Sequence, residues 1–287
     1  MSCFLCGDRD YYHVPGKLRD SDCLFMKKCQ SCGLVYISDK SHIADGFYEN
    51  SNMLSEDLKK NISKWEKINK ADTDRRIKQF KDSITNKKIL DIGCGTGSFI
   101  KKADEYTQDA SAVEVDSILN KYLSKNSKSI NFYESIDSIP DGKTFDYIFL
   151  FHVIEHLNDP DKFLINLQKY IEKGGSIVIE VPNADDALCS LYNCKEFQDF
   201  FYWKCHLYYF NQDTLKKLAS KTNLKVDYVK QIQRYPLSNH LHWLRHGKPG
   251  GHTKLNFLDS DILNSEYEKS LASIGKCDTL LMKMTKE

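Results

Sequence analysis

The sequence lacks the features of a membrane protein and of a protein with one dominant charge. Its 287 residues contain no apolar run near the roughly 18 residues that a membrane-spanning helix needs. The N-terminus has no basic segment followed by an apolar stretch, the pattern of a secretory signal peptide. With 41 basic and 40 acidic residues, the net charge of +1 gives no general attraction to nucleic acid or to an anionic membrane. We therefore expect a cytoplasmic protein without membrane contact.

Cysteine is plentiful, with ten residues. In the cytoplasm these are expected to be reduced thiols and not disulfides. Four of them form two C-x-x-C pairs, Cys3 with Cys6 and Cys29 with Cys32, and a glycine follows each pair directly. Four thiolates match the tetrahedral coordination of Zn²⁺ and fill it, so the metal would be structural. The spacing predicts a zinc ribbon, and four free thiols are the alternative.

The segment Ile89–Phe99 has the pattern of a strand, a tight turn and the start of a helix. Gly93, Gly95 and Gly97 let the backbone approach a ligand closely, and the helix that follows offers free N–H groups. The spacing differs from G-x-G-x-x-G, and the lysine of a P-loop is missing. Asp91, just before the glycines, would repel a pyrophosphate but suits a ligand with an ammonium group. S-adenosylmethionine (SAM) carries an ammonium and a sulfonium.

The order of strands and helices that starts at this loop resembles the class I SAM-dependent methyltransferases. The resemblance implies an α/β fold with a Rossmann-like core of seven strands. Glu114, at the tip of the second strand, would accept hydrogen bonds from both ribose hydroxyls. Ser135 and Ile136 fall where the family lines the adenine, and His152, after the fourth strand, would also lie beside the cofactor. The alternative is a non-catalytic Rossmann-like domain, because a fold does not fix a function.

We expect three regions along the chain. They are the ribbon over residues 1–40, a helical linker over residues 41–86 with its helix from Ile43 to Ile84, and the methyltransferase domain over residues 87–287. Tyr48 and Trp65 of the linker either cover the SAM pocket as a lid or simply pack on the core. Acceptor-binding insertions are expected at residues 183–210 and 235–262, and the stretch from Pro236 to Asp259 is expected to be irregular.

Three histidines are candidates for removing a proton from a methyl acceptor. The spacing of His152 and His156 resembles a metal-binding pair, but no carboxylate stands at a fitting distance in the sequence. A hydrogen bond at a helix start is the alternative for His156. The third candidate, His206, lies in the segment Lys204–Leu215, which resembles the E-H-L-x-Y-F-S/N-x-x-T/S-L stretch of bacterial sugar methyltransferases that carry an N-terminal zinc ribbon.

That second resemblance implies that His206 is the general base, and a buried anchoring histidine is the alternative. The sequence departs from the sugar C-methyltransferases at two positions: Cys205 stands where they carry Glu, and Trp203 where they carry Tyr. It also ends without their large additional C-terminal domain. These departures favour O-methylation over C-methylation.

The stretch that follows Gln233 resembles a segment of capsule-cluster methyltransferases and is expected to bind the acceptor. Its basic side chains and the Gly250-Gly251 pair suit a diphosphate, and an aromatic ring could stack on a sugar or base. A solvated basic loop is the alternative. The expected acceptor-binding residues are Tyr48, Trp203, Arg234, Tyr235, Asn239, Trp243, Arg245, Lys248 and His252.

These features together predict a SAM-dependent O-methyltransferase that acts on a hydroxyl of a nucleotide-diphosphate sugar, for capsule or other surface polysaccharide. Its cofactors would be SAM and a structural Zn²⁺. The alternatives are a sugar C-methyltransferase, an N-methyltransferase of a small metabolite, and an RNA methyltransferase whose ribbon binds RNA. The near-zero net charge disfavours the last of these. The sequence specifies neither the sugar, the nucleotide, the methylated position nor the oligomeric state.

Overall fold

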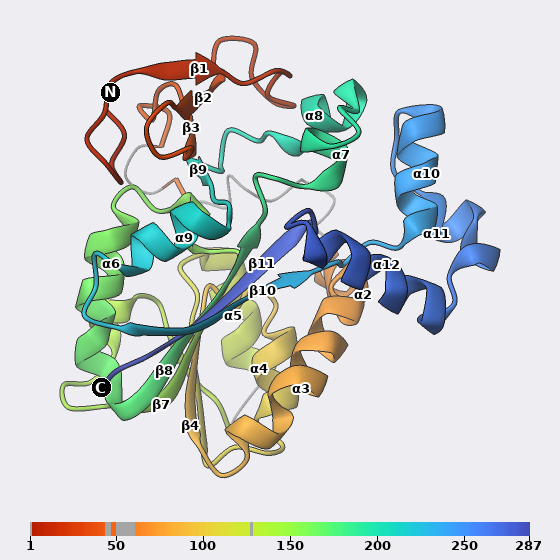
Figure 1. Ribbon diagram of the computed structural model, residues 1–287. Coiled ribbons are helices and arrows are strands. Elements are labelled where there is room, and N and C mark those ends of the chain that lie inside the picture. Colours follow the sequence, from red (N-terminus) through yellow and green to blue (C-terminus); the bar gives the residue numbers. More distant parts are fainter. Residues whose placement is uncertain (1, 44–46, 50–60, 127–128) are drawn as a thin grey trace.

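The computed structural model describes residues 2–43, 47–49, 61–126 and 129–287 (Figure 1). A seven-stranded mixed sheet forms the centre of the described chain, and a small four-stranded antiparallel sheet lies beyond the carboxyl ends of its parallel strands. This arrangement is the predicted α/β fold with a Rossmann-like core, so the predicted fold class is confirmed.

The large sheet positions the candidate site through its strand order. In spatial order the strands are β10 (Lys225–Ile232), β11 (Thr279–Thr285), β8 (Ile171–Pro182), β7 (Phe145–Phe151), β4 (Lys88–Ile92), β5 (Asp109–Val113) and β6 (Asn131–Tyr133). All neighbours pair in parallel except β11, which is antiparallel to both β8 and β10. The chain runs outward from β4 in one direction and then returns to β7 on its other side. Ligands of such sheets bind at this reversal, outside the carboxyl ends of the strands.

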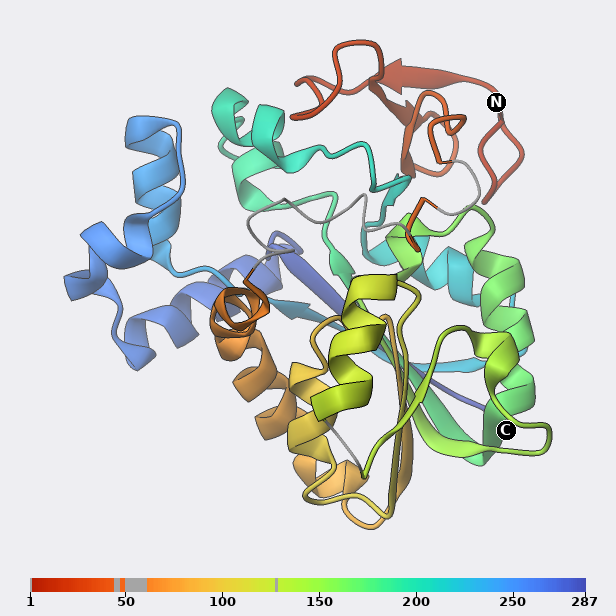
Figure 2. The ribbon, with the colours of Figure 1, turned by 180° about the vertical axis from the view of Figure 1, so that it is seen from behind.

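Helices cover both faces of the sheet, as the two views show (Figures 1 and 2). The helices α3 (Lys70–Ile84) and α4 (Ser98–Ala103) pack on one face, and α6 (Pro160–Leu167) and α9 (Gln212–Ala219) pack on the other. Successive residues of β4 face opposite sides of the sheet. Ile89 packs in the core under α3 and α4, and Leu90 packs in the core under α6 and α9. The continuous apolar run of this strand is therefore the pattern of a parallel strand that is buried on both faces.

The small sheet contains the predicted ribbon and one strand from a distant part of the chain. Its order is β1 (Tyr11–His13), β2 (Met26–Cys29), β3 (Val35–Ile37) and β9 (Tyr208–Tyr209). Tyr36 of β3 pairs with Tyr208 of β9, and both side chains are buried. The N-terminal strands therefore share a sheet and a hydrophobic core with the segment that contains His206.

The structure corrects two expectations about helices. Within the described residues the linker is helical only from Ile62, in α2 (Ile62–Ile68) and α3, while residues 47–49 form a turn. The expected helix over residues 44–46 and 50–60 lies outside the described residues.

The expectation of an irregular stretch between Pro236 and Asp259 is wrong. Three elements occupy it, α10 (Leu237–His246), α11 (Gly251–Lys254) and η4 (Asn256–Leu258), and α12 (Asp261–Ser273) follows. Gly247 adopts a φ of 62° and ends α10, so this glycine terminates a helix and does not prevent one. None of the helices in the described ranges is long and apolar enough to cross a membrane.

The start of α9 generates a stability prediction. The Asn211 side chain accepts a hydrogen bond from the Thr214 N–H at 2.9 Å, and the Thr214 hydroxyl accepts one from the Asn211 N–H at 2.8 Å. We expect Asn211→Ala to lower the free energy of unfolding by about 1 kcal/mol, because the helix loses its N-cap. Asn211→Ser keeps a side-chain acceptor without placing a second carboxylate beside Asp185, and it serves as the control. Urea unfolding measures both variants, and an Ala variant as stable as the wild type contradicts the prediction.

Candidate active site

The glycine-rich loop joins β4 to α4 in a conformation that requires glycine. Gly93, Gly95 and Gly97 have φ angles of 68°, 59° and 73°, in the left-handed region that other residues rarely adopt. A Cβ atom at Gly93 would also lie 2.6 Å from a methyl group of Val153, and one at Gly97 would lie 2.7 Å from a methyl group of Leu123. The backbone of the loop is therefore fixed, with its N–H groups at the carboxyl end of β4.

Two buried carboxyl groups lie beside this loop. Glu114 accepts hydrogen bonds from the N–H of Gly95 at 2.7 Å and from the N–H of Asp116 at 2.9 Å. Burial raises the pKa of Glu114 to about 7. Burial, together with the nearby charge of Glu114, also raises the pKa of Asp91 to about 7. A cationic ligand would favour the charged form of both groups, as expected for a SAM site.

The other expected cofactor contacts border the same edge of the sheet. Ser135 follows β6, and Ile136 opens the short helix η1 (Ile136–Ser138), whose first carbonyl accepts a hydrogen bond from the Tyr170 hydroxyl at 2.8 Å. Trp65 of α2 lies over the loop, with its ring 3.7 Å from the Cβ position of Gly95. The structure therefore brings the linker helix against the glycine-rich loop.

A buried ion network that sequence reasoning missed fixes α3 against the sheet. Glu180, at the carboxyl end of β8, is fully buried and accepts hydrogen bonds from Arg75 at 2.8 and 2.9 Å and from Arg76 at 2.6 and 3.2 Å. The charges of both arginines outweigh the effect of burial and hold the pKa of Glu180 well below its usual range. An acidic residue within the apolar strand β8 was the available signal.

The network continues to Arg234, one of the expected acceptor-binding residues. Its guanidinium forms an ion pair with Asp72 of α3 and contacts the His152 ring nitrogen Nε2 at 3.2 Å. Burial alone would raise the pKa of Asp72, but the charge of Arg234 outweighs this effect and lowers that pKa to about 2. The positive charge of Arg234 is therefore compensated within the protein.

His156 and His206 lie together at the end of η2 (Ile154–His156), with their rings 4.7 Å apart. The Nδ1–H of His156 donates to the Cys205 carbonyl at 2.8 Å, which leaves its Nε2 unprotonated. Burial lowers the pKa of His156, and burial and the neighbouring histidines lower that of His206 well below its usual value. Both rings are therefore neutral at neutral pH and able to accept a proton.

Glu155 supplies the carboxylate that sequence spacing did not associate with these histidines. One of its oxygens lies 3.2 Å from Nδ1 of His152, and its ligand atoms lie within 4.8 Å of those of His156 and His206. Its other oxygen, Oε2, and Nδ1 of His206 are buried and have no hydrogen-bond partner among the described residues. The expectation that no carboxylate accompanies the histidines is therefore wrong, because η2 folds Glu155 back toward them.

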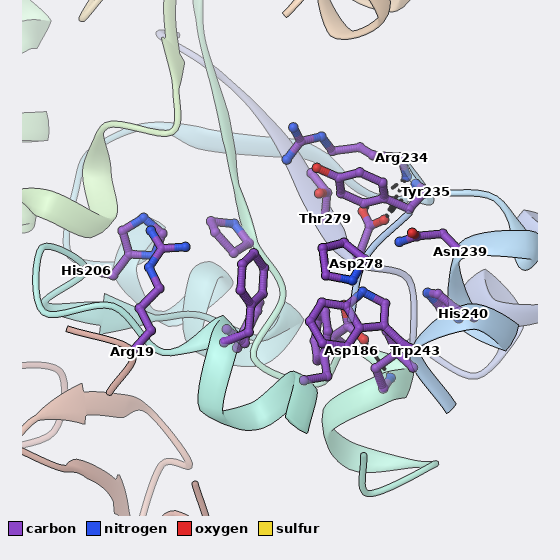
Figure 3. A pocket seen from close by; sticks show the side chains of 16 residues that line it. Arg19, Asp186, His206, Arg234, Tyr235, Asn239, His240, Trp243, Asp278 and Thr279 are labelled. Carbon is purple, nitrogen blue, oxygen red and sulfur yellow. Dashed lines mark hydrogen bonds between the residues drawn. The ribbon is translucent and has the colours of Figure 1, made fainter. Parts of the chain in front are cut away.

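A cavity of about 210 Å³ adjoins His206 (Figure 3). It lies between the helices α7 (Ala187–Ser190) and α8 (Lys195–Phe201) on one side and α10 on the other, and we call it the α8–α10 cavity. Its wall is rich in aromatic side chains, and one residue of the ribbon, Arg19, contributes to it. Its lining includes Arg19, Phe200, His206, Arg234, Asn239 and His240.

The expected acceptor residues divide into two groups. Arg234, Tyr235, Asn239 and Trp243 line the α8–α10 cavity, although Trp243 is buried against Phe197. The others do not line it: Trp203 and Tyr48 contact His206 and His156, and Arg245, Lys248 and His252 are exposed on the α10–α11 arm. Tyr48 donates from its hydroxyl to the His156 carbonyl at 2.9 Å. The expected cluster of basic side chains is therefore not gathered at one site.

The four ribbon cysteines converge. The Sγ atoms of Cys3 and Cys32 are 3.5 Å apart, those of Cys6 and Cys29 are 3.4 Å apart, and all four lie within 4.8 Å of one another. Tetrahedral Zn–S bonds of about 2.3 Å would place the sulfur atoms about 3.8 Å apart. The donor set and its spacing therefore fit a zinc ion.

The raised pKa values beside the glycine-rich loop generate a pH prediction. Asp91 and Glu114 lose their charge as the pH falls through about 7. We expect the dissociation constant of SAM to increase below that pH, by up to about tenfold per unit for each carboxyl group that must ionise. Calorimetry measures this dissociation constant between pH 5.5 and 7.5, which is roughly the window set by these pKa values. In Asp91→Asn, the dissociation constant should depend less steeply on pH. Affinity that is constant or higher at acidic pH contradicts the assignment.

Comparison with known proteins agrees with this geometry. Residues 65–229 match the methyltransferase domain family, which is more than half of the chain. The ubiquinone biosynthesis O-methyltransferase of Rickettsia bellii is 28% identical over 114 residues, which cover 38% of this chain and 47% of that protein. The mitochondrial enzyme of the same name from Candida albicans is 28% identical over 133 residues, 41% of this chain and 39% of that protein. The chain thus spans about half the length of the curated relatives it matches.

Among solved structures, coclaurine N-methyltransferase bound to N-methylheliamine and S-adenosylhomocysteine (SAH) superposes with a TM-score of 0.50. The two sequences are 13% identical, and the match covers 75% of this chain and 72% of that one, so the likeness concerns the fold alone. The family match, the strand order and the glycine-rich loop lead to one conclusion: the chain belongs to the methyltransferase domain family and has the class I SAM-dependent methyltransferase fold.

Proposed function

We propose that this protein transfers a methyl group from SAM to a hydroxyl of a nucleotide-diphosphate sugar, for a capsular or other surface polysaccharide. The observation that carries the proposal is the position of His206, a neutral histidine that lines an aromatic cavity at the carboxyl edge of the sheet. Aromatic walls suit the apolar faces of sugars and bases. The resemblance of the segment around His206 to bacterial sugar methyltransferases supports the choice of a sugar as the acceptor.

SAM supplies an electrophilic methyl group when it is bound. Asp91 and Glu114 would hold its ammonium and ribose groups, and the glycine-rich loop would approach its amino-acid part. On the acceptor side, His206 would take the proton of the attacking hydroxyl, and the Glu155 carboxylate would stabilise the resulting imidazolium. Alignment of the two reactants within one closed site would supply much of the acceleration.

The surroundings of His206 favour an oxygen nucleophile over a carbon. Cys205 replaces the glutamate of the sugar C-methyltransferases, and here it is buried and uses its carbonyl to hold His156 and Tyr48. The side chain at that position therefore offers no second acid or base to the acceptor. The names of the relatives include both O- and N-methyltransferases, so the acceptor atom needs a direct test.

The test of this function is a panel of nucleotide sugars incubated with the protein and SAM. We expect at least one to gain the mass of a methyl substitution, and fragmentation to locate the methyl group on a sugar oxygen. A methyl group on carbon or nitrogen would contradict O-methylation. A panel that stays unmodified while an RNA or a small amine is methylated would overturn the choice of acceptor.

Replacement of the proposed base generates a kinetic prediction. We expect His206→Ala to lower kcat by about 10²–10⁴-fold with little change in SAM affinity. Because burial lowers the pKa of His206, the wild-type kcat measured at saturating SAM should fall only at pH values below the usual histidine pKa of about 6.5. The variant should lack this fall in kcat, whereas both proteins should show the weaker SAM binding expected below a pH of about 7. His246→Ala, an exposed histidine of α10, is the matched control. If His206→Ala keeps most of its turnover, the base role passes to His152 or His156.

The cysteine cluster generates a metal prediction. We propose that Cys3, Cys6, Cys29 and Cys32 hold one structural zinc per chain, because four thiolates leave no position open for substrate. Elemental analysis of the purified protein should find one zinc, and Cys3→Ser should reduce it and lower the melting temperature. Cys23→Ser, at an exposed thiol outside the cluster, should change neither. A fully folded, metal-free wild type would refute the assignment.

A further inference from the structure

The loop between β1 and β2 carries Arg19 from the ribbon to the α8–α10 cavity. Three hydrogen bonds, two from its backbone N–H groups and one to the Asp20 side chain, fasten it to the segment around α8. These are Lys17 N–H to the Asp199 carboxylate at 2.8 Å, Arg19 N–H to the Tyr202 carbonyl at 2.9 Å, and Lys204 N–H to the Asp20 carboxylate at 3.0 Å. Leu18 is buried between them. The position of Arg19 is therefore fixed by hydrogen bonds on both sides.

The guanidinium of Arg19, an exposed residue, lies over two aromatic rings. It lies 4.5 Å from the ring centre of Trp203 and 5.4 Å from that of Phe200, and it lines the cavity beside His206 (Figure 3). Stacking uses the face of a guanidinium and leaves its N–H groups at the edge available for hydrogen bonds. Among the described residues, the side chain of Arg19 forms no hydrogen bond or ion pair.

The charges of the other cavity residues are already balanced. Arg234 is paired with Asp72. Burial lowers the pKa of His240 to about 4 and keeps the pKa of His206 well below its usual value, so both rings are neutral. Burial also raises the pKa of Asp186 to about 8, which leaves this carboxyl group neutral near pH 7. Asp278, whose pKa burial also raises, accepts hydrogen bonds from the backbone N–H groups of Arg234 and Tyr235. Arg19 is therefore a cationic side chain of the cavity that has no carboxylate partner among the described residues.

We propose that Arg19 binds the phosphate oxygens of the acceptor, so that the zinc ribbon forms one wall of the acceptor site. The proposal rests on the proposed function and adds the residue that distinguishes a nucleotide-linked sugar from a free one. A planar guanidinium donates two parallel hydrogen bonds to a phosphate, which a point charge cannot do. Its place beside His206 would put the sugar of a bound nucleotide sugar next to the proposed base.

The same geometry gives the ribbon a role in binding. β3 pairs with β9, which directly follows His206 and Leu207. The loop that holds Arg19 joins the paired strands β1 and β2, and the four cysteines cluster at the opposite end of this pair. The metal cluster would then act on the reaction by holding Arg19 in place and not by contact with substrate.

Binding to the full-length protein saturated with SAH tests the proposal. The probes are the diphosphates of uridine, thymidine, guanosine and cytidine, each compared with its nucleoside, and glucuronic acid represents a carboxylate. We expect one diphosphate to bind more tightly than its nucleoside. Arg19→Gln should lower the affinity for that diphosphate by about 10- to 100-fold and leave the affinity for the nucleoside unchanged. Arg19→Lys should recover part of the loss. Arg9→Gln removes the same charge from an exposed position of the ribbon outside the cavity and should bind like the wild type.

Three outcomes would overturn the role of Arg19. They are equal diphosphate affinity in Arg19→Gln and the wild type, an equal loss in Arg9→Gln, and tighter binding of glucuronic acid than of every diphosphate. Failure of the proposed function looks different: no sugar is methylated, while the loss of diphosphate affinity in Arg19→Gln is still measurable. Conversely, methylation of a nucleotide-diphosphate sugar with the same kcat and KM by the wild type and Arg19→Gln would overturn the phosphate contact and leave methyl transfer to sugars intact.

Discussion

The arrangement of the site depends on the buried carboxylate of Glu180. It lies with no exposed surface at the end of a central strand, and the guanidinium groups of Arg75 and Arg76 surround it. A carboxylate buried in this way is tolerated only with such partners, and removal of one partner from a buried pair typically costs about 3–5 kcal/mol. The pairing therefore fixes α3 against the sheet edge at one position. Because α2 precedes α3 directly, the same contact places Trp65 over Gly95.

This constraint extends from the cofactor side to the acceptor side. Asp72, one helical turn before Arg75 and Arg76, pairs with Arg234, and Arg234 contacts His152 while lining the α8–α10 cavity. A shift of α3 would thus disturb the loop that approaches the cofactor and the wall of the cavity together. On the far side, the ribbon holds the cavity through β9 and through the loop of Arg19. The cavity is therefore built from three parts of the chain that are distant in sequence.

A feature could be predicted from the sequence when its residues are close together along the chain, and it was missed when they are far apart. The glycine-rich loop and each C-x-x-C pair are recognised from spacing over a few residues, and Glu114 from its place at the end of the next predicted strand, so these patterns were visible without a structure. The contacts Glu180–Arg75, Glu155–His206 and Arg19–Trp203 join distant segments, and a single sequence does not identify the partner of each residue, even where, as at Glu180, it shows an unusual acid within an apolar strand. The α10 helix was missed for another reason: the stretch from Pro236 to Asp259 was expected to be irregular, whereas Pro236 and Gly247 mark the two ends of a helix. The basic residues of this region also looked like one cluster, but helix geometry separates Arg234 from Arg245 and Lys248.

A structure of the protein with SAH and the diphosphate that binds most tightly tests the central claim most directly. We expect the SAH ribose to lie against Glu114 beneath Trp65, and the diphosphate to lie in the α8–α10 cavity within hydrogen-bond distance of Arg19, with His206 between the two ligands. A structure in which neither ligand contacts these residues would contradict this arrangement. The clearest contradiction would be a diphosphate bound to Arg245 and Lys248 on the exposed α10–α11 arm, with the cavity empty.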